Sequence, residues 1–152
     1  MKIIKILGVA FAMLILGQPA FAGEEAAEAG PTLYERMGSW DGVNKIVGDT
    51  IALHLANDDI AHFFAEVDVK KLQSHVTAFF AAGTGGPNKY EGRDMVTTHT
   101  GMNMSDADFD SAVSDVLKAV RKNVEEEAVA EEVNAILQSL RPAVMGTAAP
   151  AG

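Results

Sequence analysis

The side chains with the most distinctive chemistry in this sequence are four imidazoles, which belong to His54, His62, His75 and His99. Helical spacing places His75 and His99 among apolar neighbours. A buried imidazole needs a partner, because an unpaired polar group in an apolar site is costly. For a lone histidine the simplest partner is a backbone carbonyl. Two such histidines, separated by the glycine-rich segment 83–88, favour a shared ligand between them.

Large apolar side chains lie close to these histidines in the sequence, and they are Phe63, Phe64, Phe79, Phe80, Met95 and Met102. Such surroundings suit a flat hydrophobic cofactor whose metal takes axial nitrogen ligands, as the iron of haem does. A structural zinc site would need four close ligands, often with cysteine. The chain has no cysteine, so the sequence favours haem over zinc.

Helices are the elements that must position these histidines. Apolar residues recur with helical spacing in four stretches, near residues 43–55, 72–80, 109–120 and 129–144. Thr32 and Ser105 are each followed three residues later by an acidic residue, a capping pattern that predicts helix starts. We expect the first helix to end at Gly38, the last to stop around Pro142, and residues 90–98 to form a poorly helical approach to His99. No stretch alternates as a strand does, so the predicted fold class is all-α.

The first 22 residues have the pattern of a secretory signal peptide, with a basic start, an apolar centre and small residues at Ala20 and Ala22. We expect cleavage after Ala22 and export to the periplasm or the medium. The alternative, an uncleaved anchor, is disfavoured because the apolar run is shorter than a membrane span. An acidic flexible linker over residues 23–31 and a disordered tail over 146–152 are expected to flank one folded domain, residues 32–145.

The charge of the expected mature chain restricts its partners. Removing residues 1–22 takes away two of the 12 basic residues and none of the 21 acidic ones, so ten minus 21 gives a formal charge of −11. This surface would repel nucleic acid and anionic lipid. A small gas ligand and a basic redox protein are the partners it allows, without stable membrane insertion after cleavage. The absence of cysteine excludes disulfides and covalent c-type haem.

Several segments, in this order and spacing, resemble the group I truncated haemoglobins. They are TLYERMG at 32–38, DDIAHFFAEVDVKK at 58–71, HVTAFF at 75–80, GGPNKYEGRDM at 85–95 and then His99. The run SDADFDSAV at 105–113 is similar to the opening of their penultimate helix. The resemblance covers about residues 32–145. It implies a shortened globin fold, a two-over-two helical sandwich, which holds one non-covalent haem b.

The resemblance also implies roles for individual residues. His99 matches the proximal iron ligand, and His75 matches a position from which some members supply a distal ligand or a hydrogen bond. The residues expected to contact the cofactor are Phe63, Phe64, Lys71, Leu72, Val76, Phe80, Arg93 and Met95. Among these, Lys71 and Arg93 match places from which a basic side chain can reach the haem propionates, and the alternative is that they are solvated surface charges.

The sequence departs from the family pattern at the distal side. Ile51 stands where many members have a tyrosine, and Leu72 and Val76 stand where a glutamine is often found. The remaining candidate donors are His75 and His54. We therefore expect reversible binding of dioxygen or nitric oxide, with nitric oxide dioxygenase activity weakened. The alternatives are a bis-histidine protein for electron transfer or redox sensing, and a haem-free helical interaction module.

Overall fold

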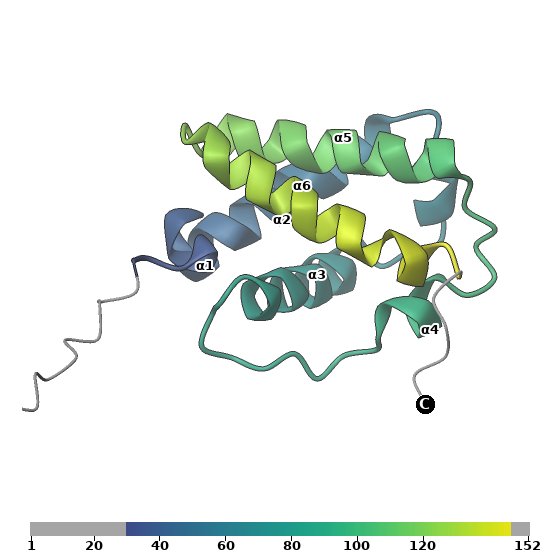
Figure 1. Cartoon of the computed structure of the whole chain (residues 1–152). Coiled ribbons are helices and arrows are strands. Elements are labelled where there is room, and N and C mark those ends of the chain that lie inside the picture. Colours follow the sequence, from purple (N-terminus) through teal and green to yellow (C-terminus); the bar gives the residue numbers. More distant parts are fainter. Residues whose placement is uncertain (1–29, 147–152) are drawn as a thin grey trace, which may run out of the picture.

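The computed structural model describes residues 30–146, which are helical and contain no strand. Figure 1 shows the elements, which are α1 (Leu33–Arg36), α2 (Ser39–Ala56), the 3₁₀ turn η1 (Ala61–Phe64), α3 (Val69–Gly83), α4 (Met95–His99), α5 (Asp106–Asn123) and α6 (Glu127–Val144). This confirms the all-α prediction. The predicted signal peptide lies outside the described residues, as do most of the linker and tail. Within residues 30–146, none of the helices combines the length and apolarity needed to cross a bilayer.

Side-chain caps fix the starts of α1 and α5, as the sequence predicts. The hydroxyl of Thr32 accepts a hydrogen bond from the backbone N–H of Glu35, whose carboxylate accepts one from the N–H of Thr32. Ser105 and Asp108 make the same reciprocal pair at α5. Each pair satisfies two backbone donors that a helix start leaves without a partner.

The turn between α1 and α2 is tightly built. Gly38 has a φ of 88°, and Ser39 follows it with a φ of 57°, which a residue with a Cβ adopts at some cost. Four residues after Gly38, the backbone of Gly42 passes so close to α1 that a Cβ there would lie 1.9 Å from the carbonyl oxygen of Met37. Glycine is therefore required at position 42 on packing grounds.

The helices form two crossed layers around one core. Helix α2 packs against both α5 and α3, and α5 packs against α6. In Figure 1, α5 and α6 lie on one side of the molecule and α3 lies on the other. Most of the deeply buried side chains come from α2, α5 and α6, among them Val43, Val120, Val129 and Val133, while Ile60 and, from α3, Thr77 are buried as fully.

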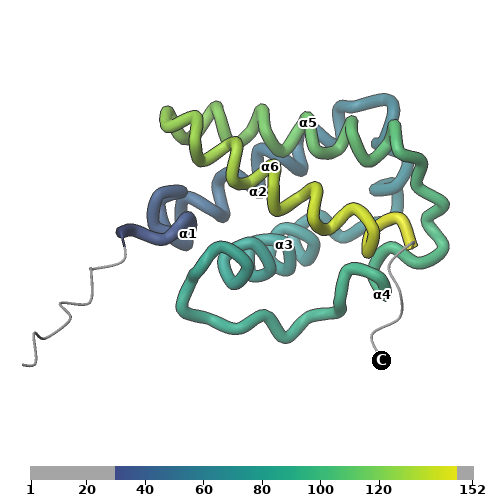
Figure 2. The backbone as a smooth tube through the Cα atoms, in the orientation of Figure 1, coloured from purple at the N-terminus to yellow at the C-terminus, as the bar shows by residue number. Residues whose placement is uncertain are grey.

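A long connection joins α3 to α4 and runs along one edge of the molecule (Figure 2). Two hydrogen bonds to the end of α3 fix the start of this connection. The hydroxyl of Thr84 donates to the carbonyl oxygen of Phe80 at 2.7 Å, and the N–H of Gly86 donates to the carbonyl oxygen of Ala81 at 2.8 Å. The prediction that residues 90–98 are poorly helical is wrong for its second half. The carboxylate of Asp94 caps α4 by accepting from the N–H of Thr97 at 2.8 Å, so helix begins at Met95.

The end of α6 lies close to the predicted position. Pro142 is inside the helix, which continues to Val144. A proline this near the end removes a single N–H from the last turn, which limits its cost.

Candidate functional site

An apolar cavity of about 270 Å³ lies between the two layers. Helices α2, α3, α4, α5 and α6 all contribute to its lining, together with Phe64 of η1 and Tyr90 of the α3–α4 connection. Its few polar side chains include three imidazoles, those of His54, His75 and His99. A mostly apolar pocket with a few placed polar groups is the usual form of a cofactor or small-ligand site.

His99 is oriented by the short helix that carries it. Its Nδ1 lies 2.8 Å from the carbonyl oxygen of Met95, one helical turn earlier. A carbonyl only accepts hydrogen bonds, so Nδ1 carries the proton, and Nε2 is the nitrogen on which the neutral ring has its free lone pair. The ring is half-buried and lines the cavity. This is the tautomer and the anchoring that a metal-binding histidine requires.

His75 lines the same cavity from α3, and its residue is exposed, so it stands where the cavity meets solvent. Ile51 lines the cavity from α2 and is only 4% exposed. The position at which the family pattern expects a tyrosine therefore presents an aliphatic side chain to the cavity.

His54 lines the cavity from α2 and is the buried member of the three. Its Nδ1 lies 3.4 Å from the Oδ2 of Asp115 on α5. Burial lowers the pKa of His54 below its ordinary value, although the hydrogen bond and charge of Asp115 act in the opposite direction. The imidazole is therefore neutral at pH 7.

Asp115 itself is 2% exposed. Burial acts to raise the pKa of this carboxyl. Hydrogen bonds from Asn57, Lys118 and His54 outweigh burial and hold the pKa below its usual value. Asp115 is therefore an ionised, hydrogen-bonded carboxylate directly behind the cavity wall.

Most of the residues that the sequence predicts for the site come together around this cavity. They are Phe64, Leu72, His75, Val76, Phe80, Met95 and His99. Phe63 lies outside the lining and packs against the ring of His62 at 4.0 Å between centroids. Lys71 and Arg93 are exposed and also lie outside the lining, with Lys71 3.9 Å from Asp68.

The sequence interpretation missed the wall that α5 and α6 supply. The cavity residues of these helices are Phe109, Ala112, Val113, Val116, Leu137, Leu140 and Val144. Their helical spacing predicts a buried face, but spacing does not say whether that face meets another helix or a cavity. Tyr90 and Asp115 were missed as well, and only Asp115 carried a signal, as an acidic residue next to an apolar stripe.

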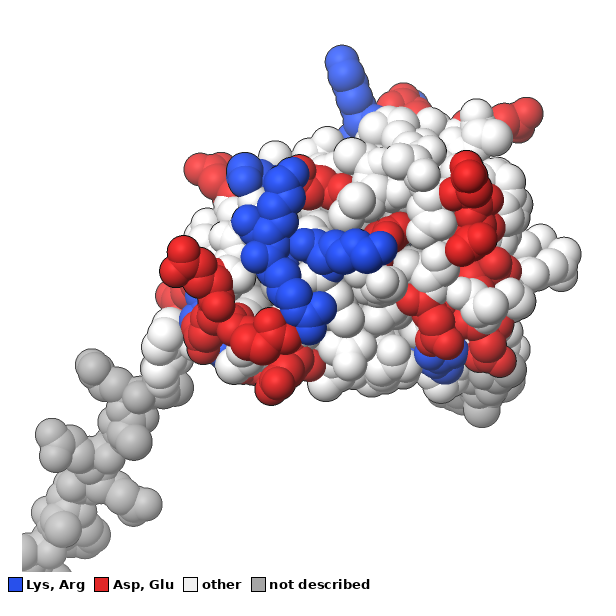
Figure 3. Space-filling view, turned by 90° about the horizontal axis from the view of Figure 1, so that it is seen from above, with Lys and Arg blue, Asp and Glu red and all other residues white. Residues whose placement is uncertain are grey.

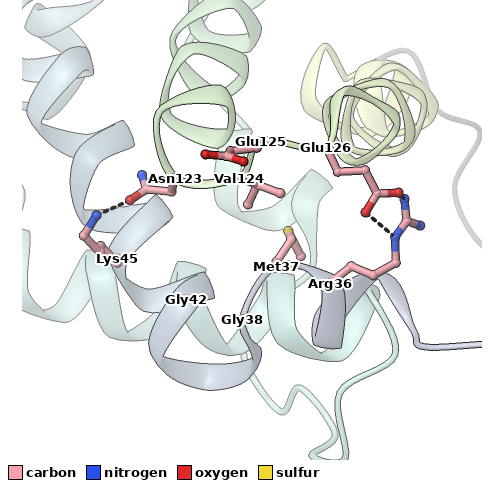
Figure 4. A pocket seen from close by; sticks show the side chains of 9 residues that line it. All are labelled: Arg36, Met37, Gly38, Gly42, Lys45, Asn123, Val124, Glu125 and Glu126. Carbon is pink, nitrogen blue, oxygen red and sulfur yellow. Dashed lines mark hydrogen bonds and ion pairs between the residues drawn. The ribbon is translucent and has the colours of Figure 1, made fainter.

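A second hollow lies where α1, the start of α2 and the α5–α6 turn meet (Figure 4). Arg36 forms ion pairs there with Glu126 and with Glu132, both at 2.6 Å, and Lys45 is hydrogen-bonded to Asn123. Its cations are thus engaged by the protein's own side chains, which makes the apolar cavity the stronger candidate site.

The surface over α5 carries charges of both signs, and Figure 3 shows its basic side chains gathered in one group. Lys118, Arg121 and Lys122 of α5 pair with Asp115, Glu127 and Asp49, respectively. The positive charges of this group are therefore largely offset by neighbouring carboxylates.

The chain is similar to proteins of known family. A family model described as bacterial-like globin matches residues 32–146. The group 1 truncated haemoglobin of Tetrahymena pyriformis is 27% identical over 115 residues, which are 76% of this chain and 95% of that protein. The group 1 truncated haemoglobin GlbN of Synechocystis is 34% identical over 105 residues, which are 66% of this chain and 85% of the relative.

Solved structures agree with the sequence matches. The Fe(III) form of the Tetrahymena pyriformis truncated haemoglobin matches with a TM-score of 0.72 at 27% identity, covering 76% of this chain and 98% of that one. THB1 of Chlamydomonas reinhardtii matches with a TM-score of 0.66 at 30% identity, covering 78% and 99%. Because the family match spans almost the whole described region and the fold is the two-over-two globin sandwich, this chain belongs to the group 1 truncated haemoglobins.

Proposed function

We propose that the chain is an exported haem protein that binds a diatomic gas reversibly, with His99 as the proximal ligand of the iron. The observation that carries this proposal is the state of His99. Its Nδ1–H is held by the carbonyl of Met95 at 2.8 Å, and its Nε2 lone pair is left for a metal at an apolar cavity. Membership of the truncated haemoglobins supports the same reading.

The donors and the lining fit haem. Among the described residues, no three histidine, cysteine, aspartate or glutamate side chains gather as a metal cluster would need, so a metal here requires a cofactor that supplies its other ligands. The apolar side chains of Phe64, Leu72, Val76 and Phe80 offer the surroundings that a porphyrin needs. With no cysteine for thioether bonds, the proposed form is non-covalent haem b. When bound, haem supplies the iron that takes up the gas.

The chain's own residues would then set ligand affinity. His75 would either supply a second ligand to the iron or stay off it and donate a hydrogen bond to the bound gas. In the first case, the external ligand competes with an internal one and its apparent affinity falls with the open fraction. In the second, one hydrogen bond contributes about 1.5–3 kcal/mol. Ile51 offers no hydrogen bond, which weakens the case for an oxygen-activating enzyme.

A second candidate function rests on the presence of two histidines at one cavity, His75 and His99. Two imidazoles on one iron would give an electron carrier or redox sensor, and the acidic surface would suit a basic redox partner.

Absorption spectra of the purified chain test both candidates. Gas binding with His75 off the ferrous iron predicts a five-coordinate ferrous spectrum and rapid carbon monoxide uptake, whereas the electron carrier predicts low-spin bands in both oxidation states and slow uptake. His99→Ala should abolish stable haem retention, while the matched variant His62→Ala, at an exposed site outside the cavity, should retain haem fully. A His99→Ala protein with stoichiometric haem would refute the proximal assignment.

Export is part of the proposal and needs its own measurement. It rests on the signal-peptide pattern of residues 1–22. Expression of the full chain in a bacterial host, followed by fractionation and N-terminal sequencing, should give a periplasmic protein that begins at Gly23. A cytoplasmic product that still carries Met1 or Lys2 would contradict export.

A further inference from the structure

The cavity wall formed by α2 and α5 contains a buried polar pair that the proposed gas binding does not use. His54 is 9% exposed and Asp115 is 2% exposed. Their closest atoms, Nδ1 and Oδ2, lie 3.4 Å apart, a long hydrogen bond between residues far apart in the sequence. Buried polar groups are costly unless they are paired, so this pair is a specific arrangement of the fold.

Asp115 is held on both of its oxygens. Asn57 donates to Oδ2 at 2.7 Å, and Lys118 donates to Oδ1 at 2.9 Å from a side chain that is 61% exposed. Asn57 also donates to the hydroxyl of Ser111 at 2.9 Å, which fixes the amide in place. The carboxylate therefore stays ionised and keeps a fixed position behind His54.

The ionised carboxylate decides which tautomer His54 adopts. It only accepts hydrogen bonds, so Nδ1 must carry the proton and Nε2 must be bare. Within residues 30–146, Nε2 of His54 has no hydrogen-bond partner, and no side-chain nitrogen or oxygen is both fully buried and unpaired. Nε2 must therefore border open space. For a residue that lines the cavity, this space is the cavity itself.

The ring is also held in orientation. It stacks on Phe64, with centroids 5.3 Å apart and an interplanar angle of 23°. Phe64 is a lining residue too, so both stacked rings border the cavity. A neutral imidazole with a bare nitrogen, an ionised orienting carboxylate and a fixed ring plane is the arrangement of a general base.

We propose that His54 is a proton acceptor for weak acids HX that enter the cavity and are held there as anions X⁻, with hydrogen cyanide and hydrogen sulfide as the chemical class. This inference rests on the proposed function, because ferric haem iron is the centre that would hold X⁻. The H–X bond breaks, its electron pair stays on X, and the proton moves to Nε2 of His54. Release of the ligand as HX reverses each of these changes.

Asp115 is the positioning residue for His54 in this proton transfer. It fixes the tautomer before the proton arrives and pairs with the imidazolium afterwards, while its own proton state does not change. The titratable groups that line the cavity together with His54 are His75 from α3, His99 from α4 and Tyr90 from the α3–α4 connection. From α5, Asp115 contacts His54 and Lys118 pairs with Asp115, and η1 contributes the uncharged ring of Phe64. His75 is exposed, so it lacks the buried carboxylate partner that orients His54.

The decisive experiment compares a ligand that must lose a proton with one that has none. Cyanide association with the ferric protein and carbon monoxide association with the ferrous protein are measured for wild type and His54→Leu. Cyanide association should slow by about a hundredfold or more, the lower end of what a positioned base contributes. Carbon monoxide association should stay within about threefold, because no proton moves.

Two further variants separate chemistry from packing. His54→Gln keeps a polar side chain of similar size but no base, so it should slow cyanide association as His54→Leu does. His62→Leu replaces an exposed histidine outside the cavity and should match wild type. Cyanide association that is unchanged in His54→Leu, or that slows only in parallel with carbon monoxide association, would overturn the proposal while leaving haem binding intact. A chain that takes up no haem would instead overturn the proposed function.

A second measurement determines the tautomer of His54 without adding any ligand. In the ¹⁵N-labelled chain, the histidine nitrogens should show His54 with a protonated Nδ1 and a bare Nε2 near pH 7. In Asp115→Asn this preference should weaken, because an amide can also donate to Nδ1. The same variant should shift the pH profile of cyanide association, whereas a purely structural Asp115 would leave that profile unmoved. An Nε2-protonated His54 in the wild type would overturn the proposal.

Discussion

The two walls of the cavity differ in how deeply they are embedded in the protein. Helices α2 and α5 each bury six residues, whereas α3 buries two and α4 buries none. The α2–α5 wall belongs to the core, and its imidazole, His54, is locked to Asp115. The α3–α4 wall carries its imidazoles, His75 and His99, on exposed or half-buried positions.

This difference separates two tasks. The α2–α5 wall, together with α6, provides the burial that stabilises the fold. The α3–α4 wall offers histidines whose replacement removes little buried apolar surface. Substitutions in the first wall should therefore change the free energy of unfolding, and substitutions in the second should change ligand binding with little effect on folding.

The largest effect on stability is expected where the start of α2 packs against the end of α1. In Gly42→Ala, the new Cβ would lie 1.9 Å from the carbonyl oxygen of Met37, so α1 and α2 must move apart. Moving packed backbones should cost about 3 kcal/mol or more. Thermal unfolding at matched haem content should show a melting temperature lower by roughly 10 °C or more.

The matched control lies in the other wall. Gly83 is the last residue of α3, and a Cβ there would meet nothing within 4 Å. Gly83→Ala should therefore leave stability unchanged or raise it by about 0.5–1 kcal/mol. Equal melting temperatures for Gly42→Ala and wild type would show that the α1–α2 contact is not a fixed part of the fold.

An effect of intermediate size is expected when a buried valine and an exposed valine are each replaced by alanine. Val133 of α6 is fully buried at 0% exposed, and Val96 of α4 is 41% exposed. Val133→Ala should lower the free energy of unfolding by about 2 kcal/mol, through lost burial and the space left behind. Val96→Ala should change it by less than about 0.5 kcal/mol. Urea unfolding measures both, and similar losses would contradict the division of tasks.

The same difference explains what the sequence could predict. Thr32 and Ser105 cap their helices through partners three residues away, and the Nδ1 of His99 reaches a carbonyl four residues away. Such local arrangements depend on spacing, which a sequence displays directly. The helical stripes likewise predicted which faces of α2, α5 and α6 are buried.

Contacts between residues far apart in the chain could not be predicted from the sequence. Asp115 lies 61 residues from His54, and no local pattern links them. Phe63 and Phe64 are adjacent, so their side chains leave the chain in different directions, and spacing does not say which of them faces the cavity. The structure places Phe64 there and turns Phe63 to His62.

The smallest expected effect is the pH dependence of the free energy of unfolding that His54 causes in the α2–α5 wall. Burial lowers the pKa of His54 in the folded state, with Asp115 opposing part of the shift. In the unfolded chain this imidazole titrates near about 6.5. As pH falls through that value, the unfolded chain gains a proton that folded His54 does not take up, so the unfolded state is favoured. His54 thus contributes stability that is fully present above about pH 6.5 and declines below it.

Urea unfolding is measured at about pH 7.5 and about pH 5.5, on either side of this titration. The free energy of unfolding of the wild type should be lower at the acidic pH, and this decrease should be smaller in His54→Gln. The pKa of Asp115 is also lowered, but its contribution is lost only as pH falls below the ordinary aspartate value of 3.8, so it does not enter this window. His62→Gln, at an exposed histidine of η1, is the matched control and should retain the wild-type loss. A loss as large in His54→Gln as in wild type would mean that acid acts elsewhere, and the α2–α5 wall would then lack the buried titrating group that distinguishes it from the α3–α4 wall.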